Sequence, residues 1–301
     1  MSIIVMAVLG LTQITFAQDT TRMIQKSVSK KKKVSLSLDA QFIDGVRDFE
    51  TATLHSFSNL TRMFLGGEYL FSDISKFTLR FPVVFQKDNV DFSIPGFTST
   101  SSDQFFTDRL RLGAEGKLFL RTVLGRISWF TEGYLPTMTG YKNVEYRFLN
   151  HPALAYGLKN LMPIAGSHVF ILGSVGHIMK FEKSFRDMER DYGDELAASF
   201  GAGYAILPLL TPVVRLQYSY IFPFKETFKS HIIRKDKKGA SAVHVAPSLS
   251  VPIHENLAVR ADSRVLIHRD KINGGDAGHL WGNFEDEGDY AVSLGIRVGI
   301  I

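Results

Sequence analysis

Residues 34–42 read VSLSLDAQF, and apolar and polar side chains alternate along the whole stretch. Every even-numbered residue from Val34 to Phe42 is apolar, and every odd-numbered residue between them is polar. Successive side chains of a β-strand point to opposite faces, so this period of two predicts a strand with one apolar and one polar face. The fold of the chain depends on how often this pattern recurs.

Eleven further stretches follow the strand period. One of them, 168–181, is apolar on both faces for part of its length. The spacing of apolar residues that marks a helix is almost absent after residue 33. Stretches of about ten residues are long enough to cross the hydrocarbon of a bilayer when the strands are tilted. The chain is therefore predicted to be all-β, with strands at 34–42, 63–71, 77–86, 110–118, 127–135, 148–159, 168–181, 196–206, 214–222, 243–251, 257–268 and 290–300.

The connections between these stretches alternate in length. Short links are expected at 72–76, 119–125, 162–166, 207–212 and 252–256. Long polar links are expected at 43–59, 87–105, 136–146, 182–195, 223–241 and 269–289. An even-stranded up-and-down transmembrane barrel with both ends on one side has this rhythm, with short periplasmic turns and long extracellular loops.

On these twelve stretches and their connections, residues 34–301 resemble the Gram-negative outer-membrane β-barrel proteins of the twelve-strand, porin-like or channel class. The resemblance implies a closed antiparallel barrel in the bacterial outer membrane, with lipid, lipopolysaccharide and the barrel-assembly machinery as partners. A closed sheet is the only sheet that leaves no backbone polar group unpaired in lipid. The chain has no run of 18 apolar residues, which excludes a helical span. The alternative is a soluble β-sandwich or barrel.

The amino terminus is predicted to be a signal peptide covering residues 1–17. Residues 3–11 are apolar apart from one glycine, and the more polar stretch that follows ends in the small residue Ala17. Residues 18–33 carry six cations and one anion and are predicted to form a basic periplasmic arm before the barrel at 34–301. A buried N-terminal strand is the alternative for residues 1–17.

The formal net charge of +5 is located in this arm, because the remaining 29 cations and 29 anions of residues 34–301 cancel. Within the predicted barrel the charges are segregated. The long loops are mostly acidic, as at 187–195 and 285–289, although the loop 223–241 is basic. The inward faces carry mostly cations, namely Arg80, Arg109, Arg111, Lys117, Arg126, Arg147, Lys159, Lys180, Arg215, Arg260, Arg264 and Arg297, against Asp39, Glu68, Glu115, Glu132 and Asp262.

Fixed positive charge inside a water-filled pore raises the local concentration of anions. The sequence therefore predicts a passive channel for small hydrophilic, anionic solutes. The predicted pore-lining residues are Arg80, Arg109, Arg111, Glu115, Lys117, Arg126, Glu132, Arg215, Arg260, Asp262, Arg264 and Arg297. The small inward residues Ala197, Ser199, Gly201 and Gly203 are expected to leave room on one wall.

Two alternatives give these charges another role. Arginines and carboxylates could pair across strands as internal struts, and Asp39 would then pair with Arg297 if the first and last strands meet. The second alternative is a structural or surface-interaction barrel whose lumen is occluded and whose long loops carry the function.

Catalytic chemistry has little support in the sequence. The chain has no cysteine, which excludes thiolate metal sites and cysteine nucleophiles, and it has no phosphate-binding loop, nucleophile elbow or zinc-protease helix. No catalytic residue, metal or cofactor is expected, and no nucleic-acid partner. A third hypothesis, an outer-membrane hydrolase, rests on histidines that could lie near a rim, namely His151, His168, His177 and His244.

Overall fold

A computed structural model describes the chain from residue 33 to residue 300 with gaps. The described residues are 33–50, 54–72, 75–92, 100–107, 109–122, 125–137, 151–181, 183–185, 188–190, 193–206, 210–228, 233–237, 239–254, 256–270 and 290–300. The predicted signal peptide and nearly all of the predicted basic arm lie outside these residues. In the described part of the chain, no helix is long and apolar enough to cross a membrane.

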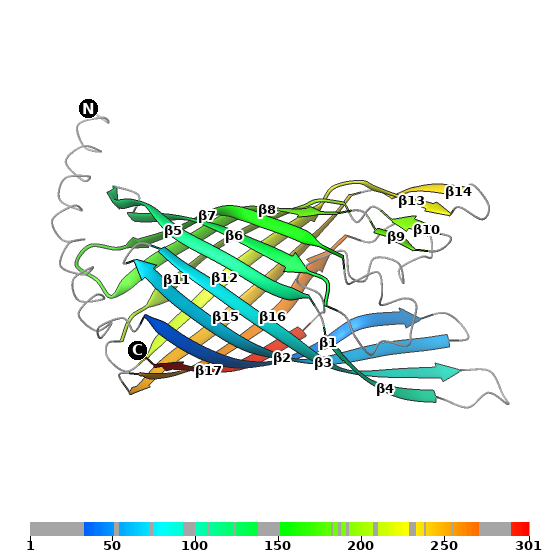
Figure 1. The fold of residues 1–301 in the computed structure, drawn as a ribbon, viewed down its shortest axis with the longest axis horizontal. Coiled ribbons are helices and arrows are strands. Elements are labelled where there is room, and N and C mark those ends of the chain that lie inside the picture. Colours follow the sequence, from blue (N-terminus) through cyan, green and yellow to red (C-terminus); the bar gives the residue numbers. More distant parts are fainter. Residues whose placement is uncertain are drawn as a thin grey trace.

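Twelve strands form a closed barrel, each antiparallel to both of its neighbours (Figure 1). The predicted up-and-down barrel is confirmed, and each of the twelve predicted strands is present. The barrel strands are β1 (Val34–Glu50), β2 (Leu54–Ser72), β3 (Ser75–Phe92), β5 (Leu110–Thr122), β6 (Gly125–Leu135), β7 (Ala153–Pro163), β8 (Val169–Lys180), β11 (Glu195–Tyr204), β12 (Thr211–Ile221), β15 (Ala240–His254), β16 (Leu257–Arg269) and β17 (Tyr290–Gly299).

Pairing between the first and last strands closes the sheet. The ladder of β1 and β17 runs from Ser35 opposite Gly299 to Asp44 opposite Tyr290. Below this ladder the amide of Ile300 donates a hydrogen bond to the carbonyl of Val34 at 2.9 Å. The start of β1 and the end of β17 thus lie at one end of the barrel. The short connections lie at that same end, which we call the short-turn end, and the opposite end is the long-loop end.

The outer face of the barrel is a continuous belt of exposed apolar side chains. Every barrel strand contributes at least one large apolar residue that is more than a third exposed, for example Leu36, Leu65, Phe77, Leu118, Leu135, Leu154, Val175, Leu196, Leu216, Leu249, Val265 and Leu294. Soluble monomers rarely expose apolar patches larger than a few hundred Å². A closed sheet with this exterior belongs in a bilayer, so the soluble-sandwich alternative is wrong.

Two of the segments predicted as long loops are largely strand. Beyond a register shift between Ile43 and Arg47, β1 and β2 pair again up to Glu50 opposite His55, so 43–59 is mostly a hairpin. The segment 87–105 is likewise shared by β3 and the extra strand β4 (Thr100–Thr107). Outside lipid a strand needs backbone partners but no apolar face, and the alternation that marks the membrane strands is therefore missing.

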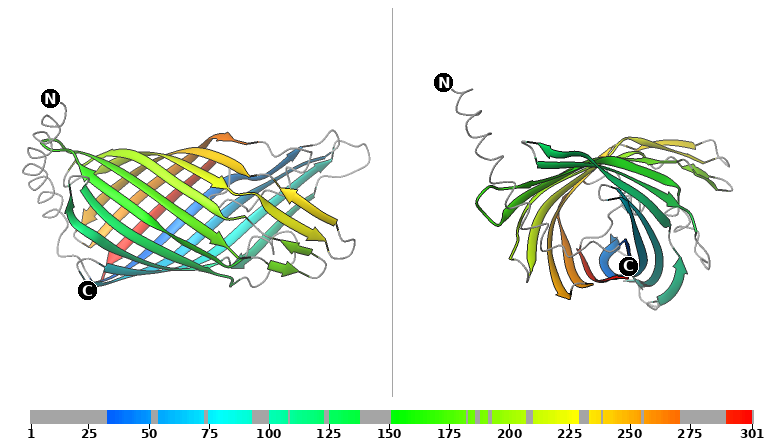
Figure 2. Two further views of the ribbon diagram at one scale, coloured as in Figure 1. Left: turned by 90° about the horizontal axis from the view of Figure 1, so that it is seen from above. Right: turned by 60° about the vertical axis from the view of Figure 1, so that its left-hand side comes forward.

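The loops after β8 and β12 form a second sheet at the long-loop end. Its strands are β9 (Lys183–Phe185), β10 (Met188–Arg190), β13 (Phe224–Phe228) and β14 (Ile233–Lys237), in the order β14-β13-β10-β9. Figure 2 shows this sheet beyond the end of the barrel. The predicted loops 182–195 and 223–241 therefore contain two hairpins that pair with each other through β10 and β13.

The ends of β15 and β16 at the long-loop end are joined by a side-chain cap. One carboxylate oxygen of Asp270 accepts hydrogen bonds from the amide of Ser241 at 2.8 Å and from its hydroxyl at 2.7 Å. The amide of Asp270 in turn donates to the carbonyl of Ser241 at 2.9 Å. The hydrogen bonds from Ser241 hold the pKa of Asp270 below its ordinary value, with a smaller contribution from His268.

Replacing Ser241 by alanine is expected to raise the pKa of Asp270, because the hydroxyl that stabilises the carboxylate is lost. The cap stabilises the folded chain above the ordinary pKa of about 4, and this contribution is lost as the pH falls through the lower folded pKa. Carbon-13 NMR titration of the carboxyl groups in micelles, with Asp270→Asn to assign the signal, checks this. An unchanged pKa in Ser241→Ala would contradict the assignment of the cap.

Candidate functional site

The strand register places the predicted pore-lining residues in the phase opposite to the exposed apolar side chains, which is the inner face of the barrel. These residues are Arg80, Arg109, Arg111, Glu115, Lys117, Arg126, Glu132, Arg215, Arg260, Asp262, Arg264 and Arg297. They differ in exposure: Arg80, Arg260 and Arg297 are exposed, whereas Arg109 and Arg264 are buried. Arg147, which the sequence also placed inside, lies outside the described residues.

The inner face also carries residues that sequence reasoning missed. Arg62 and Phe64 lie on it because they share the phase of Glu68 on β2, and Lys76 lies opposite Glu115. Phe130 and Tyr134 of β6 face inward as well, since they lie opposite Glu115 and Arg111. Alternation alone could have located the two cations, but Arg62 lies just before the predicted strand 63–71 and Lys76 lies in the predicted short link 72–76.

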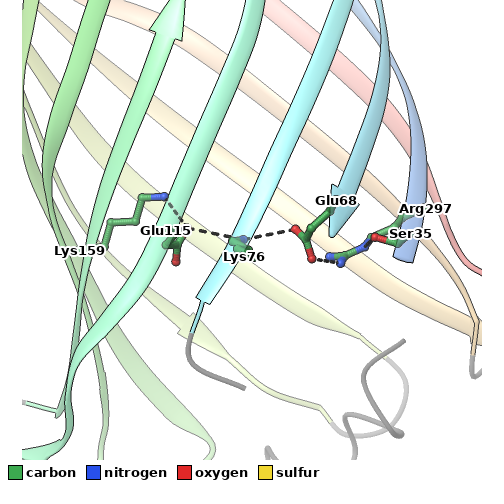
Figure 3. A network of polar contacts seen from close by, with 6 residues as sticks. All are labelled: Ser35, Glu68, Lys76, Glu115, Lys159 and Arg297. Carbon is green, nitrogen blue, oxygen red and sulfur yellow. Dashed lines mark hydrogen bonds and ion pairs between the residues drawn. The ribbon is translucent and has the colours of Figure 1, made fainter. Parts of the chain in front are cut away.

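Near the short-turn end, six polar side chains form a chain of contacts across half of the wall (Figure 3). We call this chain the ion-pair belt, made of Ser35, Glu68, Lys76, Glu115, Lys159 and Arg297. Glu68 accepts from Arg297 and from Lys76, the latter at 3.3 Å. Glu115 is 3.5 Å from the Lys76 ammonium and 3.0 Å from that of Lys159. The belt thus has three cations for two carboxylates.

The predicted pair between Asp39 and Arg297 is wrong, although the two strands do meet. Asp39 lies opposite Gly295, whereas Arg297 lies opposite Ser37. From there the guanidinium of Arg297 donates to the hydroxyl of Ser35 at 3.2 Å and reaches across β1 to Glu68 on β2. The partner could not be read from sequence because it depends on the stagger between β17, β1 and β2.

The other half of the wall carries separate polar contacts. The hydroxyls of Ser174 and Ser199 lie 2.8 Å apart, and Arg215 lies 3.5 Å from the hydroxyl of Ser248. Arg260 and Asp262 form an ion pair at 2.7 Å. The side chains of Arg260 and Arg297 are 54% and 52% exposed although they face inward. Solvent therefore reaches the inner wall at this level.

The small inward residues of β11 do not leave the room that the sequence indicated. A Cβ atom at Gly203 would come within 2.2 Å of the ring of Phe170, and one at Gly201 within 2.7 Å of the Arg215 side chain. On the neighbouring strands the ring of Phe130 lies over Gly157 and Gly176 in the same way. The glycines allow large neighbouring side chains to lie flat against the wall, so they mark close packing.

Further from the short turns, arginine and aromatic side chains alternate in a stack that we call the arginine ladder: Arg62, Phe64, Arg111, Tyr134 and Arg109. The guanidinium of Arg111 lies 5.1 Å from the Phe64 ring and 5.2 Å from the Tyr134 ring. Arg62 lies 5.8 Å from Phe64, and Arg109 lies 5.1 Å from Tyr134. Such cation–π contacts hold guanidinium groups in fixed orientations.

Toward the long-loop end the inner wall is packed. Lys180 and Glu195 form an ion pair at 2.9 Å whose side chains are 0% and 1% exposed. Glu195 was assigned to an acidic loop by sequence, but it is the first residue of β11 and faces inward opposite Ile178. Ile221 and Phe224 form a buried apolar cluster at this end. The inner wall thus changes from exposed charged groups to buried side chains along the barrel.

The histidines proposed for a hydrolase are divided between the two faces. His151 and His244 are buried, and His151 lies 3.5 Å from the Arg109 guanidinium. His177 lies on the outer face, with Nδ1 3.0 Å from the Tyr156 hydroxyl and Nε2 3.2 Å from Asp194. No serine hydroxyl of the described chain bonds to His177. Within the same residues no group of three or more His, Asp or Glu side chains is arranged to hold a metal ion.

Comparison of the sequence found no matching protein family and no matching curated protein. The structure is similar to that of an outer-membrane channel from Pseudomonas putida F1, with a TM-score of 0.58, 10% identity, and coverage of 89% of this chain and 95% of that chain. It is also similar to the transport unit of the autotransporter AIDA-I from Escherichia coli, with a TM-score of 0.51, 10% identity, and coverage of 90% of this chain and 91% of that chain. The chain thus has the fold of an outer-membrane β-barrel.

Replacing Glu195 by glutamine is expected to destabilise the barrel by about 3–5 kcal/mol, because it leaves the buried ammonium of Lys180 without its carboxylate. The same change at Glu115, whose partners are partly exposed, is expected to cost less than about 1 kcal/mol. Urea unfolding in lipid vesicles measures the change in the free energy of unfolding for each variant. Equal decreases in the two variants would contradict the distinction between an open and a packed part of the inner wall.

Proposed function

We propose that the protein is a passive outer-membrane channel for small hydrophilic solutes, with a preference for anions. The proposal is carried by one observation: charged side chains that face inward, away from the apolar exterior, are exposed to solvent. Arg80, Arg260 and Arg297 are the clearest cases. In a closed barrel such exposure requires water inside, and water inside is the first requirement of a channel. The proposal includes export through residues 1–17 and a basic periplasmic arm at 18–33.

The sign of the preference follows from the charges of the inner face. Within the described residues the inward cations are Arg62, Lys76, Arg80, Arg109, Arg111, Lys117, Arg126, Lys159, Lys180, Arg215, Arg260, Arg264, Arg269 and Arg297. The inward carboxylates are Asp39, Glu68, Glu115, Glu132, Glu195 and Asp262. Ion pairs neutralise part of this excess, but even the ion-pair belt keeps one cation more than it has carboxylates. The unbalanced charge favours anions in the lumen.

One observation favours a second candidate, a barrel whose lumen is occluded and whose loops contact partners at the cell surface. The buried pair of Lys180 and Glu195 and the apolar cluster around Ile221 lie toward the long-loop end. A solute that crosses the barrel must pass this packed part. The sheet of β9, β10, β13 and β14 would then be the working surface.

Reversal potentials of the purified protein in planar bilayers under a salt gradient test the channel proposal. Arg260→Gln and Asp262→Asn remove opposite charges from one ion pair, so they break the same contact. A unit charge about 8 Å from the solute path in water is worth about 0.5 kcal/mol, or a factor of about two in anion concentration. We expect Arg260→Gln to lower anion selectivity by about this factor and Asp262→Asn to raise it.

The outcomes separate the two candidates. An anion-selective current that shifts in opposite directions in the two variants supports the channel proposal. Absence of current from protein that migrates as folded would favour the occluded barrel, and a cation-selective current would contradict the charge argument.

A further inference from the structure

The guanidinium of Arg215 on β12 has few polar partners. Within the described part of the chain its one side-chain hydrogen bond joins Nη2 to the hydroxyl of Ser248 at 3.5 Å, which is long for such a bond. Its Nε is enclosed by protein and has no hydrogen-bond partner in the same residues. The stem passes close to Gly201 of β11, where a Cβ atom would come within 2.7 Å of it. Arg215 has therefore lost water against the wall of the barrel and gained little in exchange.

Two further donors lie near Arg215 on the next two strands. Ser248 of β15 lies opposite Asp262 of β16 in the register, and Arg260 lies two residues from Asp262 on the same inner face. Arg260 binds Asp262 through Nε and Nη2, which are 2.9 Å and 2.8 Å from one carboxylate oxygen. Its other terminal nitrogen, Nη1, makes no hydrogen bond to the described chain. Arg215, Ser248 and Arg260 thus supply N–H and O–H donors from three adjacent strands.

The charges at this place do not balance. Arg215 and Arg260 are two cations, and they share one neighbouring carboxylate, Asp262. Arg260 acts on Arg215 more strongly than Asp262 does, so the net effect of these two neighbours is repulsion. A second inward carboxylate, Asp39 of β1, is two strands beyond β16. Because Arg215 is half-buried, water screens this repulsion poorly, and an anion between the two guanidinium groups would relieve it.

The three donors lie near the short-turn end, where solvent reaches the inner wall. Arg215 is the fifth residue of β12 and Arg260 is the fourth residue of β16, and both strands begin at that end. The Arg260 side chain is 54% exposed. A solute that enters from the short-turn end therefore reaches these donors without passing the packed part of the wall around Lys180 and Glu195.

We propose that Arg215, Ser248 and Arg260 form a binding site for a small oxyanion. Arg215 and Arg260 donate to it from either side, and the hydroxyl of Ser248 donates from the strand between them. Neighbouring strands are about 4.8 Å apart, so donors on β12 and β16 suit an anion whose oxygens point in several directions, such as phosphate. Chloride has one acceptor atom and gains less from donors so spaced. The site rests on the proposed function, because an anion must enter the lumen to reach it, and it adds a saturable step to that function.

Isothermal titration calorimetry on the folded protein in detergent tests the site with inorganic phosphate as the probe. We expect saturable binding of phosphate and none of chloride at equal ionic strength. Arg215→Gln is expected to weaken phosphate binding about 10- to 100-fold, because a charge-assisted contact is lost. Ser248→Ala should weaken it about 2- to 10-fold, because a neutral hydrogen bond is lost. Since Ser248→Ala leaves every charge of the lumen in place, its effect cannot come from the electrostatic potential alone.

Matched controls exist elsewhere on the inner wall. Arg80→Gln removes an exposed inward cation from β3, which is six strands from β12 around the barrel. Ser174→Ala removes an inward hydroxyl from β8. Each control should change phosphate binding less than about twofold, since charge effects at physiological ionic strength are screened beyond about 8 Å.

Unchanged affinity in either site variant, equal losses in the controls, or saturable binding of chloride would overturn the site. Anion-selective current without saturable phosphate binding would reject the site and leave the channel proposal standing. Binding without current would reject the channel and leave the site. Migration as a folded band before heating confirms that each variant is assembled, and Ser248→Ala alone decides if Arg215→Gln does not assemble.

Discussion

Backbone hydrogen bonding is the constraint on which the rest of the structure depends. In hydrocarbon an unpaired amide or carbonyl has no water to bond, so a sheet that spans a bilayer must close on itself. Here closure is the ladder of β1 and β17, extended by the bond from Ile300 to Val34. Closure defines an inside and an outside, and the period of two along each strand then assigns every side chain to one of them. The apolar belt and the charged inner wall are both consequences.

The inner wall has two parts with different energetics. Near the short-turn end the ion-pair belt and Arg260 are partly exposed, so each contact contributes little stability and can exchange with solutes. Toward the long-loop end the pair of Lys180 and Glu195 is fully buried, and breaking it would leave an uncompensated charge. The arginine ladder lies between them, with exposed Arg80 on one side and buried Arg109 within it. The ionic contacts of the wall therefore contribute less stability near the short-turn end than toward the long-loop end.

The twelve strands could be predicted because lipid enforces alternation, and VSLSLDAQF shows the pattern that the others repeat. The sequence-based predictions that were wrong concern segments on which lipid imposes no pattern. At the long-loop end, the last part of β1 to Glu50 and the sheet of β9, β10, β13 and β14 need only backbone partners. Inside, Phe64 and Tyr134 lie in the inward phase of β2 and β6, where Arg111 stacks on both rings, and a single strand's sequence does not show such a contact. The partner of Arg297 depends on strand stagger, which one strand's sequence does not contain.

The central claim is that the inner wall near the short-turn end faces water and attracts anions. The chain has no cysteine, so single cysteines can be introduced without background. Ser199 and Phe200 are neighbours on β11; Ser199 faces inward, and Phe200 is 63% exposed on the outer face. In lipid vesicles, Ser199→Cys should react with a small anionic methanethiosulfonate faster than with a cationic one of similar size, and Phe200→Cys should react with neither. An unreactive Ser199→Cys, or faster reaction with the cationic reagent, would contradict the account.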